Sequence, residues 1–140
     1  MNSTTSAVNL LKQHSLRKTP ARVEILELYA DTPHAMSHGD VERELNQMDR
    51  VTIYRTLATF EEKGIIHRAY DGGGVIKYAL CSSGCSAHQH HDEHLHFSCH
   101  QCGNTYCIEG YHVPEVKTPE GYQIDNVFLF AKGICKSCKQ

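Results

Sequence analysis

Four cysteines in the second half of the chain have the spacing of a metal site. Cys99 and Cys102 form one CxxC pair, and Cys135 and Cys138 form another. A CxxC turn places two sulfur atoms on one side of a tight loop, so two such turns can supply the four corners of a tetrahedron. Zn²⁺ accepts four thiolates in this geometry, and a closed site of this kind contributes folding energy rather than catalysis. We therefore predict a structural zinc ion bound by these four thiolates.

Other uses of paired cysteines are a redox pair and an iron–sulfur cluster. A thioredoxin-like redox pair needs a single CxxC beside a βαβ pattern, which this sequence lacks. An iron–sulfur cluster also takes four thiolates and stays open as an alternative. The chain has seven cysteines, and an odd number argues against a closed disulfide framework. Cys107 lies in a strand pattern and is expected to pack as a small apolar side chain.

Histidines form a second group of possible metal ligands. The chain has 11 of them, and five fall between residues 88 and 96. His94 and His96 are two residues apart, so on a strand both imidazoles face the same side. His67 and Cys81, from the preceding hairpin, are candidates to complete a site with them. Such a site would couple metal occupancy to the relative orientation of two parts of the chain. The alternative is a solvated histidine-rich loop.

The elements that must position these ligands divide the chain in two. All seven cysteines lie in residues 81–140, so we predict one unit over 1–81 and a second over 82–140. No stretch approaches the ~20 apolar residues of a membrane span. The N-terminal residues show no basic start followed by an apolar run, so we expect no secretory signal and a cytoplasmic protein without a membrane partner.

The first unit shows the pattern of three short helices followed by a β-hairpin. Each expected helix begins with residues that favour helix N-termini: Thr19 and Pro20, Ser37 and Asp40, and Asp49. The third helix is expected over residues 50–63. Two strand patterns, over 65–70 and 75–80, flank a glycine-rich turn. This order is that of a winged helix-turn-helix, and the alternative is a generic small α+β domain.

The second unit is expected to be mostly β. Strand patterns over 95–99 and 104–108 flank the first CxxC turn, and a longer one over 122–131 precedes the second. The segment 112–121 contains two prolines, so no long helix is expected there. The predicted fold class is therefore α+β, with an N-terminal winged helix-turn-helix followed by a small β-rich domain that carries the four-cysteine zinc site.

Five stretches, taken together and in order, resemble the ferric uptake regulator family. They are LRKTPARVEILELY, VTIYRTL, EEKGIIHR, HLHFSCHQCG and GICKSC, and the resemblance covers about residues 8–139. That family consists of metal-sensing bacterial transcription factors of the Fur, Zur and PerR types. The resemblance implies a DNA-binding winged helix, a C-terminal dimerisation domain, a homodimer on a palindromic operator in double-stranded DNA, and no enzymatic activity.

The resemblance also implies which residues contact DNA. Tyr54 and Arg55 match the family's DNA-contacting pair on a helix that enters the major groove. Arginine can bind guanine edges through two hydrogen bonds, and tyrosine can contact thymine methyl groups or phosphate. Further candidates are polar or basic residues in the same unit: Arg50, Thr52, Arg17, Lys18 and Arg22. Because the formal net charge is -2, any DNA contact has to rest on such local groups.

The regulatory metal follows from the same resemblance. In the zinc-sensing branch the site uses a residue after the recognition helix, a cysteine after the wing and two histidines, which match His67, Cys81, His94 and His96. A thiolate in a tetrahedral set favours Zn²⁺ over Fe²⁺ or Mn²⁺. The resemblance therefore implies a zinc-dependent repressor of metal-uptake genes, most like the Zur branch. The alternative is an iron- or peroxide-responsive regulator.

Two other classes of function explain only part of the sequence. A metallohydrolase would need three ligands, a bound water and a base such as Glu93, but a complete four-ligand set leaves no open position. A zinc-storage protein would explain the histidines but not the helix-turn-helix pattern with Tyr54 and Arg55. A transcriptional regulator explains both.

Overall fold

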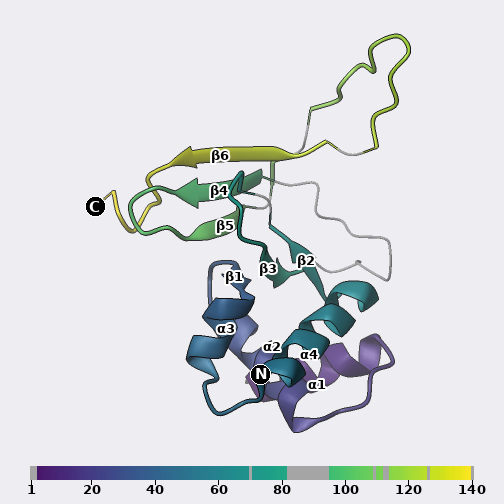
Figure 1. The fold of residues 1–140 in the computed structure, drawn as a ribbon, viewed down its shortest axis with the longest axis vertical. Helices are drawn as coiled ribbons and strands as arrows, with labels where there is room; N and C mark the ends of the chain where they lie inside the picture. Colours follow the sequence, from purple (N-terminus) through teal and green to yellow (C-terminus); the bar gives the residue numbers. More distant parts are fainter. Residues whose placement is uncertain are drawn as a thin grey trace.

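The computed structural model describes residues 3–69, 71–81, 95–108, 110–111, 114–125 and 127–139. Its helices are α1 (Ser3–Gln13), α2 (Pro20–Asp31), α3 (His38–Glu44) and α4 (Arg50–Lys63). Its strands are β1 (Met36–Ser37), β2 (Ile66–Arg68), β3 (Lys77–Leu80), β4 (Leu95–Cys99), β5 (Thr105–Ile108) and β6 (Leu129–Gly133). In Figure 1 the helices form one end of the molecule, the sheet β5-β4-β6 the other, and β2 and β3 lie between them.

The helices pack around one hydrophobic core. Helix α4 contributes Ile53, Leu57 and Phe60, which are at most 1% exposed and repeat at the spacing of one helical face. The left-handed conformation of Gly64 (φ 83°) ends this helix, where glycine carries no steric penalty. Residues on the opposite face of α4, including Tyr54 and Arg55, are exposed. The core thus fixes which side of α4 points outward.

The predicted winged helix-turn-helix is confirmed. The expected capping box begins α3, where the backbone N–H of Ser37 donates to Asp40 Oδ2 (2.9 Å) and that of Asp40 donates to Ser37 Oγ (3.2 Å). Strands β1, β3 and β2 form an antiparallel sheet in that order. The two wing strands are shorter than the expected 65–70 and 75–80, and α3 ends at Glu44.

Helix α1 was not expected from the sequence. Its residues include serine, threonine, valine and asparagine, which are mediocre helix formers, so local propensity does not reveal it. The helix forms because Ala7 and Leu11, which are 2% and 1% exposed, bury themselves in the core beside α2. Tertiary packing, which a local pattern cannot register, therefore stabilises this element.

The C-terminal sheet has the order β5-β4-β6, with β4 antiparallel to β5 and parallel to β6. The expected strands over 95–99 and 104–108 are confirmed to within one residue. The expected strand over 122–131 is wrong, because β6 starts only at Leu129 and residues 122–125 are exposed. All five residues of β4 pair with residues 129–133 of β6. The described part of β4 therefore has no residue left to pair with the segment before Leu129.

Polar contacts tie the wing to the C-terminal sheet. The hydroxyl of the buried Thr105 donates to Asp71 Oδ2 (2.8 Å), and Lys77 Nζ donates to the carbonyl of Gly103 (2.9 Å). Lys77 Nζ also lies 3.5 Å from Asp71 Oδ2. Burial acts to raise the pKa of Asp71, but the N–H of Gly73, the Thr105 hydroxyl and the Lys77 ammonium together hold that pKa below its usual value. The carboxylate is therefore charged at neutral pH and joins the wing to the C-terminal sheet.

We expect the Asp71→Asn variant to lower the free energy of unfolding by about 1–3 kcal/mol, because the buried Thr105 hydroxyl and the Lys77 ammonium lose a charged acceptor. Urea denaturation of the zinc-loaded chain at pH 7 measures the change. Asp31→Asn is the matched control, since Asp31 is exposed at the end of α2 and should change stability by less than about 0.5 kcal/mol. Equal losses in the two variants would argue against the contact.

The predicted boundary at residues 81 and 82 adjoins residues 82–94, which lie outside the described part, so the division into two units stays a prediction. None of the described helices is long and apolar enough to span a membrane.

Candidate metal centres and DNA-contacting surface

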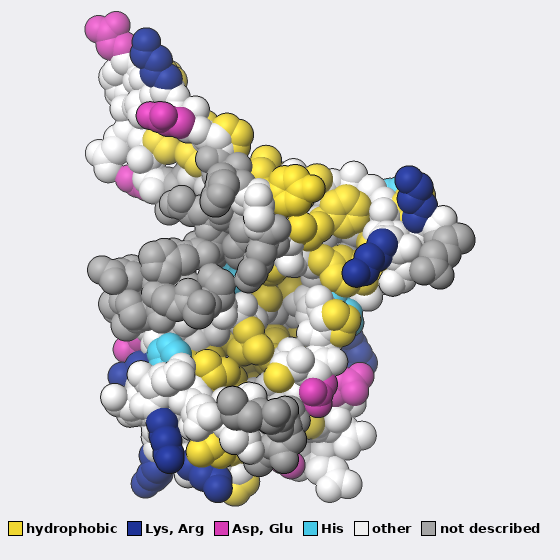
Figure 2. Space-filling view, turned by 180° about the vertical axis from the view of Figure 1, so that it is seen from behind, with side chains coloured by type: hydrophobic (Ala, Val, Ile, Leu, Met, Phe, Trp, Pro, Cys, Tyr) yellow, Lys and Arg dark blue, Asp and Glu magenta, His cyan; other side chains and the backbone are white. Residues whose placement is uncertain are grey.

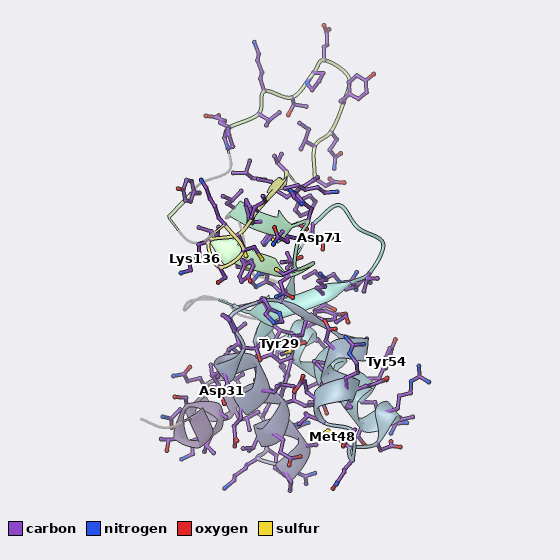
Figure 3. The ribbon with its side chains drawn as sticks, turned by 90° about the vertical axis from the view of Figure 1, so that its left-hand side faces the viewer. Tyr29, Asp31, Met48, Tyr54, Asp71 and Lys136 are labelled. Carbon is purple, nitrogen blue, oxygen red and sulfur yellow. The ribbon has the colours of Figure 1, made fainter. Side chains whose placement is uncertain are left out.

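The four paired cysteines come together at one end of the C-terminal sheet. Because β4 and β6 are parallel, with Cys99 opposite Gly133, they carry both CxxC loops to the same end (Figure 3, where Lys136 marks the second loop). All four Sγ atoms lie within 4.8 Å of one another, and those of Cys102 and Cys135 are 3.9 Å apart. Thiolates about 2.3 Å from a zinc ion lie about 3.8 Å apart in a tetrahedron. The donor set therefore fits a metal ion of that size and geometry.

Backbone N–H groups stabilise the deprotonated, metal-binding form of two of these cysteines. Those of Cys102 and Cys135 point at Cys99 Sγ, at 3.5 and 3.3 Å, and lower the pKa of Cys99 to about 6. The N–H of Cys138 likewise lowers the pKa of Cys135. In contrast, the hydrogen bond that Cys138 shares with Cys135 raises the pKa of Cys138 to about 12. A bound metal ion thus has to displace at least one thiol proton.

A second group of possible ligands contains His67, His96 and Cys107, whose ligand atoms also lie within 4.8 Å of one another. They come from β2, β4 and β5 respectively. His67 Nε2 lies 3.5 Å from Cys107 Sγ, and the two imidazole rings are stacked with centroids 5.8 Å apart. Both histidines are 2% exposed. This group therefore joins the wing to the C-terminal sheet through side chains that can bind a metal.

The predicted regulatory set also contains Cys81 and His94, which the structure does not place with His67 and His96. Cys81 does not belong to this group of ligand atoms. Its backbone pairs with Ile65, so it lies diagonal to His67, whereas Cys107 is directly opposite His96 on the neighbouring strand. Cys107 was expected only to pack, and instead its thiol faces His67. His94 lies outside the described residues.

The predicted DNA-contacting residues of α4 lie on its outward face. Tyr54 is 63% exposed, and Figure 3 shows it on the outer side of the helical unit. Arg55 is also exposed. Arg50 forms an exposed ion pair with Glu42 (3.0 Å), which is of little energetic worth. Thr52 is held by the N-cap of α4, because its backbone N–H donates to Asp49 Oδ2 (3.1 Å).

The other candidates lie where the chain enters α2. Arg17 and Lys18 are exposed, and Arg22 is half-buried with its guanidinium donating to the carbonyl of Arg17 (2.7 Å). Figure 2 shows Lys and Arg side chains gathered on the lower, helical part of the molecule. The helical unit thus presents local positive charge although the chain carries a formal net charge of -2.

Comparison with known proteins matches this architecture to one family. The model of the ferric uptake regulator family matches residues 13–129, which is most of the chain. The chain belongs to the ferric uptake regulator family. The resemblance seen in the sequence is thereby confirmed. Members of this family are metal-responsive transcription regulators rather than enzymes.

Relatives within the ferric uptake regulator family differ in the metal for which they are named. A ferric uptake regulation protein of Neisseria meningitidis serogroup C is 30% identical, covering 96% of this chain and 94% of its own. The structure of the Francisella tularensis ferric uptake regulator with iron is 25% identical (TM-score 0.55; 89% and 96% covered). A zinc uptake regulator complexed with zinc and DNA shares the fold at 22% identity (TM-score 0.63; 97% and 92% covered). Family membership therefore leaves the metal undecided.

Proposed function

We propose that this chain is a metal-responsive DNA-binding transcriptional regulator whose effector is zinc, and that it represses metal-uptake genes. The observation that carries the proposal is the group formed by His67, His96 and Cys107. Its ligands come from the wing on one side and from the C-terminal sheet on the other. A metal ion bound there favours one orientation of the two units over others, which is what a metal-dependent switch needs.

The chemistry of the ligands supports zinc. Two imidazoles and a thiolate are a common zinc donor set, whereas Fe²⁺ and Mn²⁺ sites rely more on nitrogen and oxygen ligands. We propose His94 and Cys81 as the residues from which a fourth ligand comes. The four-cysteine group is proposed to hold a second, structural zinc ion. Fe²⁺ or Mn²⁺ at the regulatory site is the alternative, favoured by the relatives named for ferric uptake.

The proposed DNA-binding mode uses the outward face of α4 in the major groove. Tyr54 and Arg55 would contact base edges, while the phosphate-contacting and supporting residues would be Arg50, Thr52, Arg17, Lys18 and Arg22. We propose a homodimer that binds a palindromic operator. Large apolar side chains exposed in the C-terminal part support a dimer interface there: Tyr111, Val116, Tyr122, Ile124, Phe128 and Phe130.

The test measures DNA binding against free metal concentration. A preferred duplex is first selected from a random-sequence pool by the zinc-loaded chain, and its affinity is then measured in buffered Zn²⁺, Fe²⁺ or Mn²⁺. Zinc should raise the affinity about 10-fold or more. A rise with Fe²⁺ or Mn²⁺ but not with zinc would establish the alternative metal. No rise with any metal would contradict metal-dependent regulation.

Arg55→Ala should weaken binding to the selected duplex by about 5- to 150-fold, the worth of one good bidentate contact to a base. Zinc content should stay unchanged, because Arg55 is exposed and lies outside both groups of metal ligands. Fluorescence anisotropy measures the affinity. Lys117→Ala is the matched control, since it removes one exposed positive charge from the connection between β5 and β6. If Arg55→Ala binds as the unchanged chain does, α4 is not the recognition helix.

A further inference from the structure

The ring of His38 lies flat against the ring of Tyr54. Their centroids are 4.9 Å apart and their planes differ by 14°. His38 is the first residue of α3, and Tyr54 projects from the outward face of α4. Tyr78, from β3, meets the same imidazole edge-on at 6.0 Å. One face of the exposed tyrosine is therefore covered by a side chain from the neighbouring helix.

His38 is held by ring packing more than by polar contacts. Its Nε2 is buried and has no hydrogen-bond partner within the described residues. The backbone at this position is fixed by the capping box of Ser37 and Asp40, so the imidazole has a firm base. A buried nitrogen without a partner costs free energy, which an apolar ring would avoid. Stability of the core alone does not explain a histidine here.

The contact has a consequence for Tyr54. An exposed tyrosine on a helix changes rotamers freely, and binding then loses the free energy needed to hold it still. A stacked ring against one face restricts that freedom and leaves the other face and the hydroxyl available. Tyr54 is thus held in place before any partner arrives.

We infer that His38 is a positioning residue that acts through Tyr54 and sets the sequence-specific part of DNA binding. This inference rests on the proposed function, in which Tyr54 meets base edges in the major groove. A phenol ring held in one direction can make apolar contact with a thymine methyl group at a defined step. The phosphate contacts of lysine and arginine do not depend on this ring.

A double-mutant cycle tests the inference. The unchanged chain, His38→Ala, Tyr54→Ala and the double variant are compared in excess zinc on two duplexes, the selected one and a random-sequence pool of equal length. His38→Ala should weaken binding to the selected duplex about 2- to 12-fold, in line with the worth of one stacked aromatic pair, and leave the random pool unaffected. The double variant should bind no more weakly than Tyr54→Ala.

His38→Phe keeps a flat ring and should restore binding to within about 2-fold of the unchanged chain, since the buried Nε2 has no hydrogen bond to lose among the described residues. His34→Ala is the matched control. His34 belongs to the same segment, but its ring meets Tyr106 of the C-terminal sheet (6.3 Å), not α4. Melting temperature and zinc content identify any variant that has lost its fold.

Any of four outcomes would overturn the inference. Equal weakening of both duplexes by His38→Ala, or a loss that simply adds to that of Tyr54→Ala, would mean that His38 does not act through Tyr54. A Tyr54→Ala variant that weakens binding while His38→Ala does not would overturn the inference and leave the proposed function standing. If Tyr54→Ala has no effect at all, the proposed recognition by α4 fails as well.

Discussion

Replacing Cys99 by serine should unfold the C-terminal sheet even in excess zinc. Cys99 is 1% exposed, ends β4 and accepts two backbone N–H groups from the two CxxC loops. A structural zinc ion of this type contributes on the order of 10 kcal/mol, which is comparable with the whole stability of a small domain. The loss of one ligand therefore removes most of what holds β4 beside β6.

The measurement combines zinc content with hydrogen exchange. Cys99→Ser should bind one zinc equivalent less than the unchanged chain, and the amides of β4 and β6 should exchange rapidly while those of α2 and α4 stay protected. Cys81→Ser is the control for the loss of a thiol outside the four-cysteine group. The amides of β4 and β6 should stay protected in this variant even where it loses the regulatory zinc. Retention of the full zinc content and of β4 protection in Cys99→Ser would refute a structural role for this site.

The second large effect concerns the regulatory group. His96→Ala and Cys107→Ser should each abolish the zinc-dependent gain in DNA affinity, or raise the free zinc concentration it needs by at least about 10- to 100-fold. Even the loss of a residue that only hydrogen-bonds to a metal ligand weakens metal affinity by that factor. The four-cysteine site should keep its zinc, because His96 and Cys107 belong to a separate group of ligand atoms. The fold should therefore survive, and the response alone should be lost.

Comparing Cys107→Ser with Cys81→Ser decides between two ligand sets. The sequence predicts Cys81, whereas the geometry favours Cys107, whose thiol lies 3.5 Å from His67 Nε2. Titration of DNA affinity against buffered zinc, repeated for both variants, separates them. Loss of the response with Cys81→Ser but not with Cys107→Ser would support the sequence-based set. An unchanged response in His96→Ala and in both cysteine variants would show that this group is not the sensor.

Local capping chemistry made α2, α3 and α4 predictable. Thr19, the box of Ser37 and Asp40, and Asp49 each begin a helix as expected. Helix α1 was not predicted because its stability comes from the packing of Ala7 and Leu11 in the core, not from the helix propensity of its sequence. The strand expected over 122–131 failed for a related reason, since a strand needs a partner and, on the side of β6, the described part of β4 pairs with residues 129–133 and not with those before them.

The two groups of metal ligands also differ in how far the sequence predicted them. The four-cysteine group was visible because each CxxC pair is local and its spacing is characteristic. Cys107 was missed although a signal existed. Counting outward from the pair of residues 99 and 104 across the first CxxC turn places Cys107 opposite His96, as the ladder shows. Its approach to His67 depends on how the wing lies against the C-terminal sheet, and no local pattern contains that information.

The parallel pairing of β4 with β6 also bears on how the family can diverge. A metal ion bound by the four-cysteine group would close a loop that contains the whole connection between β5 and β6, in the way a covalent cross-link does. The entropy of closing a loop depends only weakly on its length, so doubling the loop costs only about 0.6 kcal/mol. Insertions and deletions in residues 114–125 should therefore be almost neutral for the sheet. The sheet thus tolerates changes in the length and shape of this connection as lineages evolve new surfaces.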